Sequence, residues 1–393
     1  MNARALRRLR LMAGCLAILF PALGAYAQNA NPTPFNLGRA QDIAARPMAL
    51  GGSYTAVASD ASALYYNPAG LSAVKKHELS LSLERSVLSG VDKAGNFPSH
   101  SSRQEDLRIQ SLVWLMPVPT VRGGLTFAFG YYRPRTFSDL ISYEDSLSST
   151  RGTYAYDAEG TLENYRAGMG LDIAPDLTFG LAAGYVTGSE QIHVSDSGQV
   201  GYLRNYDGFN LEPSLMFKFS PRLRAGVSLV LWEKFFSLED IYERKGAGNS
   251  EDDYQVRYPF QVKSGLAYQG DDFLLAGDAR FNGFSQYSFG SKDASVLEKA
   301  GYKDELILSV GGERFIRPAN LVLRAGYTLN TLPETAFDPT YDLHRFSAGV
   351  GFLFSGSLVL DLAYSYSFWG LAGEGISLDN REHRALMTFA YRY

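Results

Sequence analysis

The chain has 393 residues, with 37 basic side chains against 41 acidic ones, a formal net charge of −4 and a single cysteine, Cys15. An acidic balance argues against a nucleic-acid partner, because such a partner requires a basic surface. One cysteine excludes a disulfide framework and a cysteine metal site.

Residues 1–27 are predicted to be a secretory signal peptide. Basic residues lie between positions 4 and 10, an apolar stretch follows at 11–23, and Ala25-Tyr26-Ala27 has the small residues of a cleavage site. The sequence after this segment contains no run of eighteen apolar residues, so no helical membrane span is expected. A chain of this kind crosses a membrane only as a closed barrel.

Residues 28–76 have no alternating pattern. The segment is rich in small residues and apolar enough to pack, as in ALGGSYTAVASDASALYYNPAGL at 49–71. It is too short to form a hydrophobic core of its own. We therefore expect it to pack inside a larger structure.

From residue 77 to the end, apolar and polar residues alternate in many short segments, as in a strand with two different faces. The last strand is the clearest, with Ala385, Met387, Phe389, Tyr391 and Tyr393 on one face and smaller or polar residues on the other. About fourteen strands are predicted, near 79–84, 105–116, 125–132, 165–173, 177–187, 209–219, 223–234, 254–269, 272–283, 304–315, 320–329, 341–354, 358–368 and 383–393.

The connections alternate in length. Short turns rich in Pro, Gly, Asp and Ser alternate with longer polar stretches that we predict to be loops, near 88–104, 134–160, 188–205, 236–253, 284–303, 330–340 and 370–382. This order is typical of bacterial outer-membrane barrels. We predict an all-β fold, a transmembrane antiparallel β-barrel of about 14 strands at 77–393 in the bacterial outer membrane, with residues 28–76 as an N-terminal hatch. An empty barrel of this width would be an open pore.

The hatch carries the sequence Asn67-Pro68-Ala69-Gly70. With its surroundings it resembles the hatch of the FadL-type family, outer-membrane transporters of long-chain fatty acids and aromatic hydrocarbons in which a fourteen-stranded barrel is plugged by a hatch with an Asn-Pro-Ala motif. The motif also resembles that of PorV-like barrels of the same superfamily, which serve as attachment partners for secreted proteins. From the residues alone, Asn67 is equally a helix cap after a turn, since Pro68 lacks an amide donor.

Charged residues at lumen-facing positions are expected mostly to pair with each other and with the hatch. A fatty-acid carboxylate needs a cation beside apolar surface, and the candidates are Arg166, Lys263, Arg280 and Arg345. The apolar wall beside them is predicted to come from inward-facing side chains, namely Trp114, Tyr132, Val186, Trp232 and Leu353.

The resemblance implies that the ligand leaves through a break in the barrel wall. Proline removes a donor from the strand ladder, so Pro213 and Pro259 are candidate breaks, and Gly123-Gly124 is a third. The sequence does not choose among them.

An enzyme is not expected, because the five histidines are scattered and match no catalytic motif. His383 has Asp379 and Glu382 nearby in sequence, but a solvated histidine is the preferred interpretation. No cofactor and no metal site are expected. The function implied by the resemblance is passive transport of hydrophobic small molecules across the outer membrane, in contact with its lipids. The alternative is a PorV-like barrel that docks a secreted protein.

Overall fold

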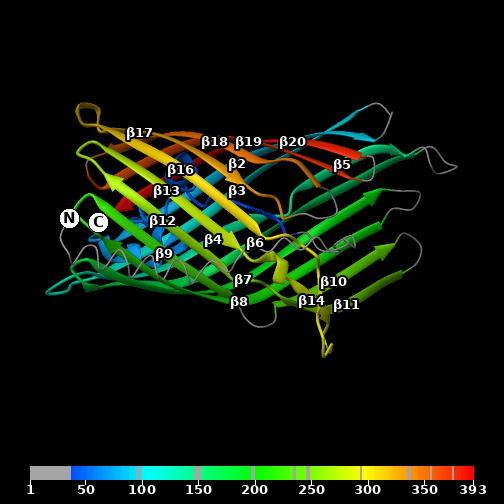
Figure 1. Ribbon diagram of the computed structural model, residues 1–393, viewed down its shortest axis with the longest axis horizontal. Helices are drawn as coiled ribbons and strands as arrows, with labels where there is room; N and C mark the ends of the chain where they lie inside the picture. The colour runs from blue at the N-terminus through cyan, green and yellow to red at the C-terminus, as the bar shows by residue number, and fades with distance from the viewer. Residues whose placement is uncertain are drawn as a thin grey trace.

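The computed structural model describes residues 37–94, 99–145, 152–195, 200–232, 236–244, 248–292, 294–333, 338–354, 356–373 and 376–393. The predicted signal peptide, 1–27, lies outside the described residues. The strands form one antiparallel barrel with a short helical segment inside it (Figure 1). Across the described ranges, no helix is both long and apolar enough to span a bilayer.

Fourteen strands close the wall within the described ranges, which confirms the predicted number. They are β2 (Glu78–Ala94), β3 (His100–Val118), β4 (Leu125–Thr136), β6 (Gly152–Ala174), β7 (Leu177–Ser195), β8 (Val200–Lys218), β9 (Leu223–Trp232), β12 (Gln261–Gln269), β13 (Phe273–Asn282), β16 (Glu305–Ile316), β17 (Leu321–Asn330), β18 (Asp338–Phe354), β19 (Leu358–Gly373) and β20 (Ile376–Arg392).

Shorter elements complete the chain. On the wall and its extension these are β5 (Asp139–Asp145), β10 (Phe236–Arg244), β11 (Gly248–Arg257), β14 (Ser288–Ser291), β15 (Glu298–Lys299) and the 3-10 helices η2 (Phe284–Gln286) and η3 (Arg317–Ala319). Inside the barrel they are β1 (Arg39–Ala40), α2 (Ala45–Ala49), α3 (Ala63–Tyr66) and the 3-10 helix η1 (Pro68–Ala73).

The first and last wall strands close the barrel. β2 pairs with β20 over their whole lengths, and Leu81 lies opposite Phe389. Both of these side chains are exposed on the outside, whereas Glu84 and Arg384 are fully buried inside. An apolar outer band around a polar interior is the arrangement of a transmembrane barrel.

Several strands are far longer than a membrane requires. β6 has 23 residues and β7 and β8 have 19 each, where about 10 suffice to cross a bilayer. The excess projects, together with β5, β10 and β11, beyond the end opposite the C-terminus (Figure 1). The predicted loops at 88–104, 134–160, 188–205, 236–253 and 370–382 are therefore largely wrong. Beyond the bilayer no lipid-facing side imposes the apolar alternation that marks a strand.

β3 contains a β-bulge at Gln110. Ser82 of β2 lies opposite Ser111, but the next residue, Leu83, lies opposite Ile109. The extra residue reverses which positions face inward along the rest of β3. Trp114 therefore faces the membrane and is 43% exposed, which corrects the prediction that it lines the lumen.

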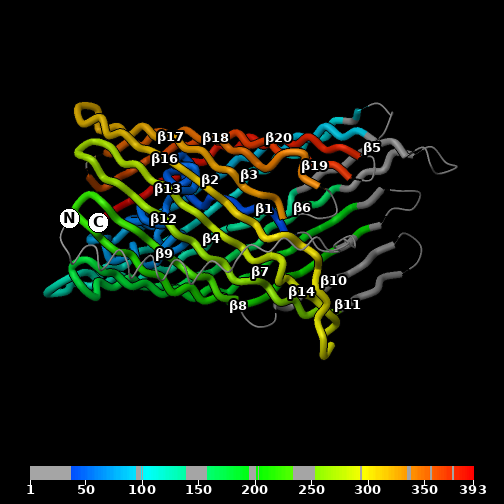
Figure 2. The backbone as a smooth tube through the Cα atoms, viewed as in Figure 1, coloured from blue at the N-terminus to red at the C-terminus, as the bar shows by residue number. Residues whose placement is uncertain are grey.

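β4 contains a second bulge, at residues 133–134. Its partner on β6 shifts between Tyr132, which lies opposite Asn164, and Arg135, which lies opposite Leu162. Pairing of β3 with β4 also ends at Tyr132. Beyond that point β1 takes the vacated edge of β4 (Figure 2), through Arg39↔Thr136 and Ala40↔Arg135. We call this place, between Gln110 of β3 and residues 133–136 of β4, the β3–β4 seam.

Of the other predicted wall breaks, Gly123-Gly124 is wrong as stated, and Pro213 interrupts one of its two ladders. Pro213 lies within β8 opposite Leu181, where the β7–β8 pairing is continuous, but the β8–β9 pairing skips from Leu211↔Leu231 to Ser214↔Ser228. Gly123 and Gly124 precede β4 in a turn, where Gly123 has a φ of +74°.

Pro259 does interrupt the wall, between β11 and β12. The break lines up with those between β13 and β14 and between β15 and β16, so a kink crosses neighbouring strands. The buried aromatic side chains of Tyr258, Phe284, Tyr287 and Tyr302 fill the inside of this kink.

The described part of the hatch, residues 37–76, packs against the inner wall. The wall strands approach it so closely that a Cβ atom on Gly180 would lie 2.0 Å from the backbone nitrogen of Ala69, and one on Gly226 would lie 2.3 Å from the carbonyl oxygen of Thr55. Glycine at these two positions lets backbone meet backbone. The hatch also holds charges against the wall, as in the Arg46–Glu313 ion pair at 2.9 Å.

Candidate functional site

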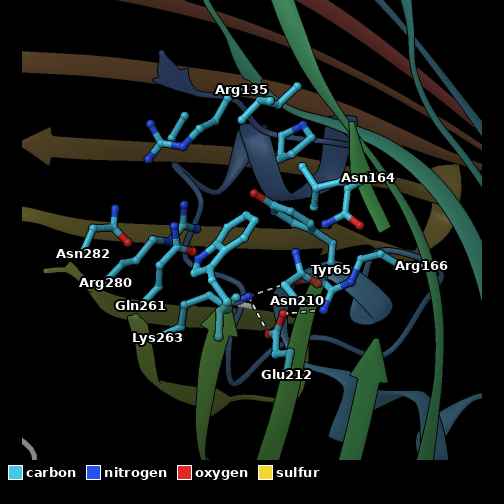
Figure 3. Close-up of a pocket in the computed structure, with 16 residues that line it drawn as sticks. Tyr65, Arg135, Asn164, Arg166, Asn210, Glu212, Gln261, Lys263, Arg280 and Asn282 are labelled. Carbon is cyan, nitrogen blue, oxygen red and sulfur yellow. Dashed lines mark hydrogen bonds and ion pairs between the residues drawn. The ribbon is translucent and has the colours of Figure 1, made fainter. Parts of the chain in front are cut away.

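A cavity of about 40 Å³ lies in the lumen between the hatch and the wall. Four cations, one carboxylate and four amide side chains line it, together with Tyr65 and a few apolar residues (Figure 3). Three of the four predicted cations, Arg166, Lys263 and Arg280, come together here. Sequence reasoning did not place them in one site, because they lie on β6, β12 and β13.

Glu212 neutralises two of these cations. Its carboxylate lies 2.7 Å from Arg166 and 2.6 Å from Lys263, and it accepts a hydrogen bond from Ser228. Lys263 also donates to the backbone carbonyl of Tyr65 at 2.7 Å. This cluster is fully buried and ties the wall to the hatch, so its charges are satisfied before any ligand arrives.

Arg280 differs from its neighbours. Among the described residues it makes no hydrogen bond and no ion pair within 4 Å, and it is only partly buried. In Figure 3 it lies across the cavity from Arg166, and no interaction line reaches it. It also lines a second hollow of about 30 Å³ on the other side of Ala40. Arg280 thus lies between two hollows, and its guanidinium N–H groups are available to a ligand.

Further polar groups face the same space. The side-chain oxygens of Asn164, Asn210 and Asn282 are buried without a hydrogen-bond partner among the described residues. Burial raises the pKa of the Tyr65 phenol, which belongs to the hatch and not to a membrane-spanning strand, so the hydroxyl stays protonated at neutral pH. The sequence analysis did not name these four residues as site residues. Alternation along β6 and β8 does place Asn164 and Asn210 on the inward face, so that signal was present in the sequence.

One side of the cavity is apolar. Leu162, Val186 and Trp232 line it and belong to a larger buried cluster that continues with Phe137, Tyr206 and the aromatic residues of the β11–β12 kink. The predicted inward positions of Val186 and Trp232 therefore fit the structure. The cavity thus has a polar side, formed by the charged and amide residues, and an aromatic side, formed by this buried cluster.

Three other predicted residues lie elsewhere in the lumen. Arg345 is bonded to Asp42 of the hatch at 2.9 Å and borders the second hollow, so it is not at the main cavity. Tyr132 is fully buried, and its ring centroid lies 5.6 Å from that of Tyr65. Leu353 faces inward near the end of β18 and lines neither hollow.

The hatch motif is a helix cap. The Asn67 side chain accepts from the backbone nitrogen of Ala69 at 3.1 Å and donates to the carbonyl oxygens of Thr55 at 2.8 Å and Leu215 at 3.3 Å. Pro68 is the first residue of η1, where its missing amide costs nothing. Asn67 therefore fixes the hatch both to itself and to β8.

His383 is not held by the acids near it in sequence. It faces outward and its Nδ1 bonds Tyr364 at 2.6 Å, whereas Glu382 points into the lumen, because neighbouring residues of β20 have opposite faces. Within the described ranges no group of three or more His, Cys, Asp and Glu side chains is arranged to hold a metal ion.

The cavity is closed to any organic ligand in this conformation. A cavity of roughly 150 Å³ holds a benzene ring, and a single water needs about 10–15 Å³. The 40 Å³ seen here holds only a few waters. A ligand therefore has to displace part of the hatch or of the aromatic cluster.

No protein-family model matches the sequence, and no curated protein matches it. Solved structures do share the fold. The Pseudomonas putida toluene transporter TodX is 15% identical, with a TM-score of 0.69 over 92% of this chain and 100% of that one. A Pseudomonas aeruginosa FadL homologue is 13% identical, with a TM-score of 0.68 over 90% and 99%. The Ralstonia pickettii toluene transporter TbuX is 15% identical, with a TM-score of 0.64 over 89% and 98%. The chain therefore has the fold of FadL-type outer-membrane transporters.

Proposed function

We propose that this protein is a passive outer-membrane channel for hydrophobic small molecules with an anionic head, such as long-chain fatty acids. One observation carries the choice of an amphiphile over an aromatic hydrocarbon. Arg280 lines the luminal cavity with no ion pair among the described residues, beside a wall of apolar side chains.

Charge supports an anionic head. Four cations, Arg135, Arg166, Lys263 and Arg280, line the cavity against one carboxylate, Glu212, and Arg135 has a further ion pair with Glu305 at 3.7 Å. A toluene-like hydrocarbon would cover Arg280 without offering it an acceptor, and burying an unpaired cation is costly. A carboxylate accepts from Arg280 and from the Tyr65 hydroxyl, and charge-assisted bonds of this kind are the strong ones.

The aromatic cluster supports an apolar tail. It extends from Leu162 and Trp232 at the cavity towards Phe137, Tyr206 and Phe284. Rearrangement of these side chains opens room for a hydrocarbon chain in continuity with the polar base.

The β3–β4 seam supports a sideways exit. Ala40, Pro134 and Arg135 of the seam line the cavity directly. Here β4 has hatch backbone on one edge, through β1 and the bond from Gln41 nitrogen to Pro134 oxygen at 2.9 Å. Withdrawal of β1 opens the wall beside the ligand, without breaking any pairing between wall strands.

Uptake by whole cells tests the proposal. A host that lacks its own fatty-acid channel is given this protein, and uptake of radiolabelled palmitate and toluene is compared with the empty host. We expect palmitate uptake to rise well above background and toluene uptake to rise less. If the folded protein is present in the outer membrane and neither compound enters faster, the channel function is refuted.

A docking role is the second candidate. One observation favours it, namely that β6, β7 and β8, with 23, 19 and 19 residues, are far longer than a bilayer requires and extend with β5, β10 and β11 towards the end opposite the C-terminus (Figure 1). A channel does not require that extension. The same uptake assay separates the two, because a barrel that only docks a protein leaves palmitate uptake at background.

A further inference from the structure

We infer that the outer face of β4, β6 and β7 carries a second binding site, a membrane-facing groove that receives the hydrocarbon tail of the transported molecule as it leaves the β3–β4 seam. The identity of the molecule that occupies the groove rests on the proposed function. It is separate from the luminal cavity, since it opens to the lipid side of the wall.

The groove exists because two small residues sit among large ones. Ala167 and Ala183 are paired across β6 and β7 and are exposed on the outside. In the same cross-strand row, Phe129 flanks Ala167 on one side and Leu211 flanks Ala183 on the other. The two alanines therefore form the floor of a hollow with apolar walls.

Aromatic residues form its upper side. Tyr131, Tyr165, Tyr185 and Phe209 are successive cross-strand partners one row above the alanines. With Trp114, Phe129 and Leu112 they border a volume of about 650 Å³. Ligand pockets typically occupy about 300–1,000 Å³, so this hollow is large enough for a hydrocarbon chain.

The tyrosine hydroxyls give the groove a polar rim. Tyr131 and Tyr165 both donate to Glu163, at 3.0 and 3.1 Å. Arg133 donates to the Tyr131 hydroxyl at 2.7 Å and lies 3.1 Å from Glu163. Arg133 balances the charge of Glu163, so the rim does not repel an acidic head while the tail lies below it.

The groove begins where the wall opens. The last two paired positions of β3 and β4 are Leu112↔Tyr131 and Ser111↔Tyr132. Leu112 and Tyr131 border the groove, and the seam starts immediately after Tyr132. Arg166 borders both the groove and the luminal cavity. A molecule that passes the seam therefore meets this hollow first, and continuity with the seam is the reason for assigning it to the transported molecule.

Two tryptophans report the two sites separately. Trp114 borders the groove, Trp232 borders the luminal cavity, and Trp369 is the third tryptophan of the chain. Proteins that keep only Trp114 or only Trp232, with phenylalanine at the other two positions, are placed in lipid nanodiscs and titrated with 9,10-dibromostearate. Bromine quenches tryptophan fluorescence on contact.

We expect saturable quenching of Trp114 above the linear background of partitioned probe. Ala167→Phe fills the floor of the groove and is expected to raise the half-quenching concentration for Trp114 about tenfold or more. Ala385→Phe, at an exposed outward alanine of β20 outside the groove, is the matched control and is expected to leave it unchanged. Heat-modifiable migration on gels confirms that each variant is folded, and Ala183→Phe replaces Ala167→Phe if the latter is not.

Each outcome is decisive. Quenching of Trp114 that stays linear, or that Ala167→Phe does not change, overturns the groove, even when Trp232 is quenched saturably and the luminal proposal stands. Saturable, Ala167→Phe-sensitive quenching of Trp114 by dibrominated phospholipid at the same mole fraction overturns its assignment to the transported molecule. Saturable quenching of Trp114 without quenching of Trp232 supports the groove and counts against the luminal site.

Discussion

At the scale of single residues, the four predicted cations differ in whether a carboxylate of the protein already forms an ion pair with them. Arg166 and Lys263 share Glu212, and Arg345 is held by Asp42. Only Arg280 of the four lacks such a partner among the described residues. The sequence was enough to place all four on inward faces, because the alternation of side chains along one strand decides which face each residue occupies. It could not rank them, because each partner lies on a different strand or in the hatch.

Arg280→Met is predicted to weaken palmitate binding about 10- to 100-fold, because a hydrogen bond to a charged group contributes roughly 1.5–3 kcal/mol. Calorimetric titration of the protein in nanodiscs measures this, with hexadecanol as a ligand of equal chain length and no charge. We expect hexadecanol binding to change little. Arg222→Met, at an exposed arginine paired with Asp271, is the matched control. Equal palmitate affinity for Arg280→Met and wild type would remove Arg280 from the site.

Trp114 shows where residue-level prediction ends. Arg108 and Trp114 share even numbering, so strict alternation along the strand places both on the inward face. Arg108 does so, but the extra residue at Gln110 turns Trp114 to the membrane. A bulge has no reliable sequence signal in a strand without glycine or proline at that point. The error arises because strict alternation was assumed along the whole of β3, and the extra residue shifts it.

At the scale of elements, the alternating pattern predicted strands only within the membrane band. β13 and β16 were placed within one residue at each end, since lipid on one face forces the alternation. β5 and the outer part of β6 were missed, because beyond the bilayer no lipid-facing side imposes the alternation. Pro134 lay inside a predicted loop, so the β3–β4 seam was not foreseen.

Many polar contacts hold the hatch, and Asn67 supplies three of them, two within the hatch and one to Leu215 of the wall. Asn67→Ala removes the cap of η1 and is predicted to lower the free energy of hatch opening by about 1–2 kcal/mol. Amides at 69–74 should then exchange with solvent roughly tenfold faster, by mass spectrometry, while the amides of β19 and β20 stay protected. Thr120→Ala, which removes an exposed turn contact to Gly123, serves as the control. Unchanged exchange at 69–74 in folded Asn67→Ala would show that the cap does not hold the hatch.

At the scale of the whole molecule, the alternating strands and the order of short and long connections were sufficient to predict the barrel. The non-alternating segment at 28–76 and its Asn-Pro-Ala motif were sufficient to predict a plug inside it. What the sequence did not contain is the state of the lumen. Its closure depends on contacts such as that of Lys263 with the Tyr65 carbonyl, which join residues 198 positions apart. Only the folded structure reveals that the two hollows hold no more than a few waters.

Single-channel conductance in a planar bilayer tests the central claim. The claim is that residues 37–73 block the lumen of a barrel that would otherwise be an open pore. The intact protein is predicted to give no steady conductance steps, because the hatch fills the lumen. A variant that lacks residues 37–73, and whose barrel still shows heat-modifiable migration, is predicted to give large and steady steps. Large steady steps from the intact protein, or silence from the folded deletion variant, would contradict the account.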